Sequence, residues 1–201
     1  MEEKPLNENE SLELISSMIK RTKGTLTDNG FYFLLWGWLV FIASAGQYIL
    51  IKLGQPELSN YTWAVLMPLG GIVSAIRGWK DEKKQKVKTY TDEMLSYALS
   101  AFIIALFIVL IFMSINGGWK LAYPMIMMVY GMWLFISGGA LKFRPLIIGG
   151  IINFACSIAG FYIHSFELIL LLSFAVLAGY IIPGHLLNAK FKRENNTNAA
   201  V

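Results

Sequence analysis

Long uncharged runs constrain this chain more than any other feature of its sequence. Within residues 94–187, full charges occur only at Lys120, Lys142, Arg144 and Glu167, each at the edge of an apolar run. The runs are about 20 residues long, the length that a helix rising about 1.5 Å per residue needs to cross roughly 30 Å of hydrocarbon. The sequence therefore predicts an all-α, polytopic membrane protein.

Composition supports one membrane-embedded bundle without a separate soluble domain. Hydrophobic residues make up 56% of the chain and charged residues 15%, against about 25% charged in an ordinary soluble domain. The N-terminal sequence MEEKPLNENE has no basic segment leading into a short apolar one, so we expect no cleaved signal peptide. Cys156 is the only cysteine, which excludes an intramolecular disulfide.

Six transmembrane helices account for the apolar runs. Backbone in lipid must satisfy its own hydrogen bonds, and a helix does so. Polar turns, prolines and glycines divide the runs into three antiparallel hairpins, 31–78, 94–140 and 145–187. The predicted spans are 31–53, 61–78, 94–115, 119–140, 145–163 and 166–187.

The distribution of Lys and Arg predicts the orientation. Of the 17 Lys and Arg residues, all except Lys52 and Lys120 lie in alternate connections or at the termini. Basic loops stay on the cytoplasmic side of a membrane. We therefore expect a multi-pass protein of the cell (cytoplasmic) membrane with both termini in the cytoplasm. The basic segments are 1–30, 77–93, 141–145 and 188–201.

The cytoplasmic N-terminal segment, 1–30, contains a predicted amphipathic helix at 9–23. Its apolar residues share one helical face, and Lys20, Arg21 and Lys23 gather at its far end. Three interpretations remain open: a helix lying on anionic lipid headgroups, a helix packing on the bundle, or a helix binding a partner protein. The tail, 188–201, is expected to be disordered.

The strongest charge run lies between the second and third spans. Each lysine near an anionic surface contributes about 1 kcal/mol, so these residues are candidates for contact with anionic lipid or with a cytoplasmic partner. The alternative is that they only fix topology. The run is short and lacks interleaved aromatic residues, which argues against nucleic acid. The lysines are Lys80, Lys83, Lys84, Lys86 and Lys88.

Inside the predicted spans the polar residues are neutral, which argues against a proton- or ion-coupled transporter. Two of these neutral polar residues carry a side-chain amide, Gln47 in the first span and Asn153 in the fifth. Each needs a hydrogen-bond partner, because an unpaired amide in hydrocarbon is costly. They are expected either to bond between helices or to form a small site for a neutral polar ligand.

No catalytic, cofactor or metal motif is present. His164 and Glu167 are three residues apart, and His185 lies elsewhere; structural zinc needs four ligands. We therefore predict no enzymatic activity, no cofactor and no metal site. A membrane enzyme would require these residues to converge on one pocket.

Small residues and prolines suggest close packing or a hinge. The second span contains Pro68 with Gly70 and Gly71, a combination that serves helix packing or marks a binding site in some transporters. The first and fifth spans also resemble each other, with Gly37 matching Gly149. This hints at tandem two-helix repeats.

The functional prediction is a non-enzymatic structural, lipid-interacting or regulatory membrane protein with a basic cytoplasmic face. Its expected partners are membrane lipids and either a cytoplasmic protein or a second copy of the chain. The alternative is a channel or carrier for a small neutral or hydrophobic solute, built around Gln47, Pro68, Gly70, Gly71 and Asn153.

Overall fold

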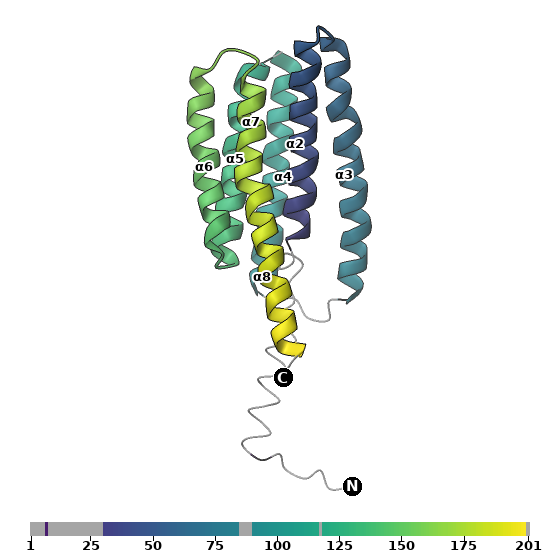
Figure 1. Cartoon of the computed structure of the whole chain (residues 1–201), viewed down its shortest axis with the longest axis vertical. Coiled ribbons are helices and arrows are strands. Elements are labelled where there is room, and N and C mark those ends of the chain that lie inside the picture. Colours follow the sequence, from purple (N-terminus) through teal and green to yellow (C-terminus); the bar gives the residue numbers. More distant parts are fainter. Residues whose placement is uncertain (1–6, 8–29, 85–89, 117, 200–201) are drawn as a thin grey trace.

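The structure is a computed structural model, and it describes Asn7 and residues 30–84, 90–116 and 118–199. These described residues form helices and contain no strand (Figure 1). The last three elements follow one another without a break, so they form one long helix with a π-helical turn, η1, inside it. The elements are α2 (Phe31–Lys52), α3 (Pro56–Lys84), α4 (Tyr90–Asn116), α5 (Trp119–Ala140), α6 (Arg144–Tyr162), α7 (Leu168–Val176), η1 (Leu177–Ile181) and α8 (Ile182–Ala199).

Five of the described helical elements are long and apolar enough to cross a membrane: α2, α4, α5, α6 and the α7–η1–α8 element. They agree with five of the six predicted spans and are compatible with an integral membrane protein. The α3 helix is 29 residues long, but it is not among the five. Polar residues within it, including Asn60, Ser74 and Arg77, reduce its apolar character.

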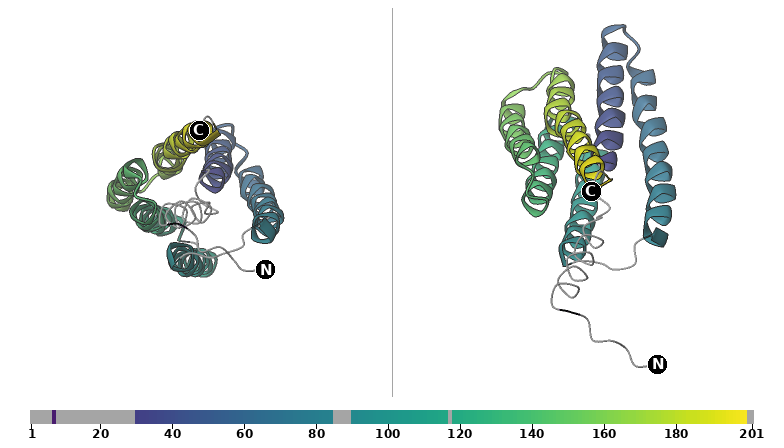
Figure 2. Two further views of the ribbon diagram at one scale, coloured as in Figure 1. Left: turned by 90° about the horizontal axis from the view of Figure 1, so that it is seen from below. Right: turned by 60° about the horizontal axis from the view of Figure 1, so that its bottom comes forward.

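The helices lie side by side along one axis, with α3 at one edge of the bundle and α6 at the other (Figure 1). Among the described residues, the backbone of α3 packs closely only against α2, and the backbone of α4 only against α5. The α3 and α4 backbones therefore do not pack against each other, and their ribbons lie apart in the view along the axis (Figure 2). We call the side of the bundle between them the open side.

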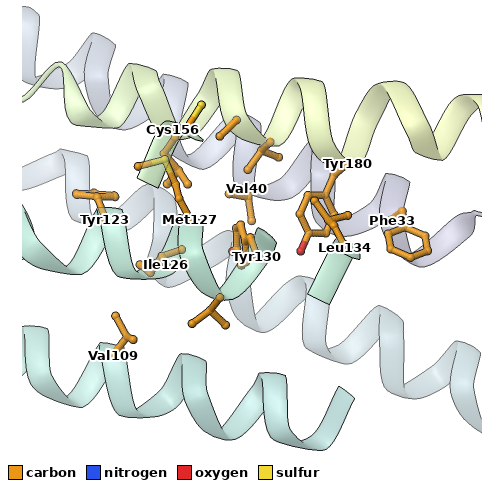
Figure 3. Packing of buried hydrophobic residues seen from close by; sticks show 14 of the residues in the cluster. Phe33, Val40, Val109, Tyr123, Ile126, Met127, Tyr130, Leu134, Cys156 and Tyr180 are labelled. Carbon is orange, nitrogen blue, oxygen red and sulfur yellow. The ribbon is translucent and has the colours of Figure 1, made fainter. Parts of the chain in front are cut away.

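The core lies between α5, α6 and the last helical element. Large side chains from these elements interdigitate with residues of α2 (Figure 3). In contrast, α4 is exposed over most of its surface, and only Leu95 and Val109 are buried. An apolar helix exposed in this way suits contact with lipid tails. The largest fully buried side chains include Met127, Leu134, Leu146, Leu168, Ile169 and Leu172.

The closest backbone packing joins α5 to α6, which belong to different predicted hairpins. A Cβ atom on Gly150 would lie 2.9 Å from the Gly131 carbonyl oxygen. One on Gly138 would lie 2.7 Å from the Ile147 nitrogen. Glycine at these positions lets the two backbones touch, as in other helix pairs in lipid. The predicted hairpins are therefore not the packing units at this interface.

Three described residues next to helix ends have a positive φ. Gly30 and Gly54 have φ of 67° and 75°, a left-handed conformation that glycine adopts without strain. Lys142 has φ of 50° in the α5–α6 turn, where Phe143 N–H donates to the Gly138 carbonyl at 2.8 Å. Pro145 lies in the first turn of α6, as the sequence predicted.

Two helix ends differ from the sequence expectation. The α3 helix continues to Lys84, past the predicted span end at residue 78. Part of the predicted disordered tail, 188–201, is helical, because α8 continues to Ala199. Both extensions contain the good helix formers Lys and Glu, and each prolongs a helix that is already formed. The predicted amphipathic helix, 9–23, lies outside the described residues.

Candidate functional site

The described Lys and Arg residues gather at one end of the bundle, which we call the basic end (Figure 1). Only Lys52 and Lys120 lie toward the opposite end. The predicted contact residues Lys80 and Lys83 are exposed at the end of α3, whereas Lys20, Arg21, Lys23, Lys86 and Lys88 lie outside the described residues. The basic end carries Arg77, Lys80, Lys83, Lys84, Lys142, Arg144, Lys190, Lys192 and Arg193.

Two of these basic residues, Arg77 and Lys190, interact with neighbouring side chains. Arg77 Nε lies 3.2 Å from Asp81 Oδ2, and the guanidinium stands over the Phe31 ring at 5.0 Å. Lys190 lies over the Phe143 ring at 5.7 Å. A partly exposed ion pair such as Arg77–Asp81 contributes little stability.

A first buried polar centre surrounds Gln47 near the other end of α2. The Trp63 indole N–H and the Tyr123 hydroxyl both donate to Gln47 Oε1, each at 2.7 Å. Gln47 is only 8% exposed. This centre joins α2, α3 and α5 through side chains alone.

A second buried polar centre surrounds Asn153, which is fully buried in α6. Its Nδ2 donates to the Gly149 carbonyl at 2.9 Å and to the Ala175 carbonyl of α7 at 3.0 Å. Its Oδ1 is buried and has no hydrogen-bond partner among the described residues. The interhelical bond matches the packing role expected for an amide in lipid.

The π-helical turn η1 begins at Leu177, two residues after the Ala175 carbonyl that Asn153 binds. Pro183 explains why the helix widens there. A proline ring clashes with the carbonyl four residues earlier in an α-helix, and that carbonyl belongs to Gly179 inside η1. The wider turn relieves this clash and lets the helix continue through Pro183.

Glycines on two neighbouring helices enclose η1. A Cβ on Gly37 of α2 would lie 3.0 Å from Tyr180 Cβ, and one on Gly149 of α6 would lie 2.8 Å from Gly179 Cα. A Cβ on Gly179 itself would overlap with the Asn153 side-chain nitrogen. The two glycines paired in the predicted repeat therefore both pack against the same turn.

Tyr180 extends from η1 into an aromatic cluster (Figure 3). Its ring lies 5.3 Å from the Tyr130 ring and 6.2 Å from the Phe33 ring. The Tyr180 hydroxyl is buried and has no hydrogen-bond partner among the described residues. Such a group costs about 1–3 kcal/mol relative to a paired one. The other such atom near this turn is Asn153 Oδ1 of α6, which belongs to the amide that lies beside Gly179.

The two predicted amides have separate partners. Gln47 bonds to α3 and α5, whereas Asn153 bonds within α6 and to α7. The two amides contact different helices, and no hydrogen bond among the described residues links them. They therefore form two separate polar centres.

The predicted hinge residues differ from one another. The α3 helix continues through Pro68 without a break. Gly70 is buried against Leu39 and Trp36, whereas a Cβ on Gly71 would meet nothing within 4 Å. One glycine of the pair thus serves packing against α2, and the other faces outward.

The remaining polar candidates lie apart. Ser165 donates to Glu167 at 3.1 Å, and His164 Nδ1 lies 3.0 Å from the Tyr162 carbonyl oxygen, all in the α6–α7 connection. His185 is exposed on α8, toward the basic end. Among the described residues, no three His, Cys, Asp or Glu side chains group as metal ligands.

Sequence reasoning did not identify Trp63, Tyr123, Gly179 or Tyr180. One available signal was the spacing of Gly179 and Pro183, which places a glycine where the proline ring needs room. No comparable signal pointed to Trp63 or Tyr123, since aromatic residues near span ends usually mark the membrane interface.

The fold defines the class only broadly: an all-helical chain with five described helices able to cross a membrane. No protein-family model matches the chain, and no curated protein or solved structure matches it.

Proposed function

We propose that the protein is a non-enzymatic integral membrane protein of the cell membrane whose basic end contacts anionic lipid headgroups. In this proposal α3 is a sixth span, and both termini lie in the cytoplasm. Short connections at the opposite end leave little polar surface outside. The protein then acts as a structural or regulatory module, with a cytoplasmic protein or a second copy as a further partner.

The observation that carries the proposal is the segregation of charge. Exposed lysines from α3, from the α5–α6 turn and from α8 occupy the same end of the bundle. Positive charge is retained on the cytoplasmic side of membranes, where anionic lipids attract each cation by about 1 kcal/mol. Several cations at one end act together on the same leaflet.

The test measures which lipids accompany the protein. The full chain is reconstituted in nanodiscs containing equal amounts of phosphatidylglycerol and phosphatidylcholine, and its associated lipids are quantified after detergent extraction. We expect enrichment of phosphatidylglycerol, and we expect it to fall when residues 1–24 are deleted and Lys80, Lys83, Lys84, Lys86 and Lys88 are changed to Gln.

The matched control changes Lys52 and Lys120 to Gln at the opposite end, and it should leave the enrichment intact. An unchanged lipid enrichment after the combined deletion and neutralisation would contradict the proposal. A pull-down from cell extract with the same variants measures any protein partner separately.

A second candidate is a carrier or channel for a small neutral or hydrophobic solute. It is favoured by Asn153 Oδ1 and the Tyr180 hydroxyl, which are buried and have no hydrogen-bond partner in the part of the chain that the structure describes. The bond from Asn153 to α7 favours tight packing instead. Stopped-flow swelling of proteoliposomes in glycerol tests this candidate: faster swelling than in empty vesicles supports it, and equal rates exclude glycerol as the solute.

A further inference from the structure

The orientation of the Gln47 amide is chemically determined. An indole N–H can only donate, so the oxygen of the amide, and not its nitrogen, must face Trp63. The Tyr123 hydroxyl donates to the same oxygen. The amide NH₂ group therefore points away from both partners, and none of the described residues accepts a hydrogen bond from it.

The NH₂ group belongs to a side chain that is largely withdrawn from the surface, since Gln47 is only 8% exposed. None of the described residues uses its two donors. Amide donors in hydrocarbon are costly without an acceptor. A molecule from outside the bundle that carries an acceptor oxygen would satisfy them.

The depth of Gln47 indicates which oxygen is available. Gln47 lies five residues before Lys52 at the end of α2, which is about 7.5 Å along the helix. In the proposed topology, on which this inference rests, Lys52 lies among the headgroups, and this depth is then the boundary between headgroups and hydrocarbon. The ester carbonyls that join acyl chains to glycerol lie at this boundary.

The open side of the bundle provides a route from the lipid. The α3 and α4 backbones do not pack against each other, and their inward apolar side chains are only half buried. These side chains contact the core and lie along a path from the Gln47 end toward the middle of the bundle. They are Trp63 and Met67 on α3, and Phe102, Ala105, Leu106 and Met113 on α4.

We propose that this open side holds an acyl-ester lipid of the leaflet opposite the basic end. The Gln47 amide donates to an ester carbonyl, and the acyl chain lies along the half-buried faces of α3 and α4. Lys120 is one helical turn nearer the bundle end than Tyr123 on the same face of α5, at the level of a headgroup. The site is separate from the basic end.

The test compares two lipids that differ only in the carbonyl. Diacyl phosphatidylglycerol and its dialkyl ether analogue, of equal chain length, are titrated separately onto the full-length protein in detergent, and bound lipid is counted by native mass spectrometry. We expect the ester to bind about three- to tenfold more tightly, the range for one neutral hydrogen bond. Equal affinities for ester and ether would overturn the proposal.

Variants locate the effect. Gln47→Met should abolish the ester preference, and Gln47→Glu should reduce it while keeping an acceptor for Trp63 and Tyr123, so the test survives if the Met variant does not fold. Tyr123→Phe is the matched control: it removes one donor to the oxygen, leaves the NH₂ group in place and should retain the preference. Retention of the preference in both Gln47 variants would refute the assignment.

The position of the chain is tested with a phosphatidylglycerol that carries a diazirine in one acyl chain. Photolabelling should modify peptides from α3 and α4, including those containing Met67 and Leu106. Labelling confined to the outer faces of α6 and α7 would contradict a lipid at the open side.

Discussion

Among the described glycines, Gly179 leaves the least room for an added Cβ. It lies inside η1, where Asn153 and Leu134 approach its backbone from neighbouring helices. Any side chain there must displace the amide that binds the Ala175 carbonyl. Gly71 in α3 is the opposite case, since an added Cβ would meet nothing within 4 Å.

This contrast gives a matched pair of substitutions. Gly179→Ala should lower the free energy of unfolding by about 1–3 kcal/mol, because it overpacks the contact with Asn153. Gly71→Ala should change it by less than about 0.5 kcal/mol or raise it slightly, because alanine favours the helix. Unfolding in mixed micelles, followed by circular dichroism, measures both. Similar losses for the two variants would show that η1 is not tightly packed against α6.

At this scale, the sequence identified the buried amides but not their partners. Gln47 and Asn153 stand out because an amide within an apolar run needs a hydrogen bond. Helical spacing places each residue on a face of its own helix, but it does not say which neighbour lies opposite. Trp63 and Tyr123 belong to other helices, so their roles depend on a packing order that the sequence does not determine.

Among the elements, the α5–α6 turn carries a conformational cost. Lys142 adopts φ of 50°, a left-handed conformation that costs a residue with a side chain about 1–2 kcal/mol. The turn is nevertheless well bonded, because Lys142 and Phe143 both donate to carbonyls near the end of α5. The fold therefore tolerates a strained residue where glycine would be relaxed.

Replacing Lys142 with Gly should raise the free energy of unfolding by up to about 1 kcal/mol, because glycine adopts this conformation without strain. The same change at Lys192, which is exposed within α8, should lower it by about 1 kcal/mol, because glycine disfavours a helix interior. Thermal melts of both variants in one detergent test the opposite signs. A loss of stability in the Lys142 variant would argue against the turn geometry.

Most helix boundaries were predictable because local chemistry sets them. Gly30 precedes α2, and Pro145 lies in the first turn of α6. The π-helical turn was not predicted, since it arises from Pro183 acting together with glycines on two other helices. The continuation of α8 to Ala199 was missed because a polar composition was taken as a sign of disorder.

At the scale of the whole molecule, the charge pattern predicts which end of the bundle faces the cytoplasm. Cysteine labelling of the two ends tests this proposed topology. In a Cys156→Ser background, single cysteines are introduced as Gln55→Cys, Lys142→Cys and Lys190→Cys. A membrane-impermeant maleimide should label only the Gln55 position in intact cells. The other two positions should react only after permeabilisation, because the basic end faces inward.

Labelling of the Lys142 position in intact cells would contradict the proposed orientation and would indicate the opposite one. Equal labelling of all three positions would mean that the ends of the bundle are not on opposite sides of a membrane. The native Cys156 is buried, so its removal is expected to affect background labelling little.

The sequence could not supply the packing order of the helices. Charge and run length predict where each span lies in the sequence and which way it crosses the membrane. The α5–α6 contact instead depends on glycines of two different helices that meet in space. The open side likewise follows from the absence of backbone packing between α3 and α4 among the described residues. A set of apolar helices can be arranged in several ways with the same alternation of ends.

The π-helical turn also changes how the last helix must be read. A π turn contains one more residue than an α turn, and each residue advances an α-helix by about 100°. A helical wheel drawn through α7 and continued into α8 therefore misassigns the outward and inward faces after Ile181. Crosslinks, spectroscopic labels or fusion joints designed for α8 need a phase counted from Ile182, not from Leu168.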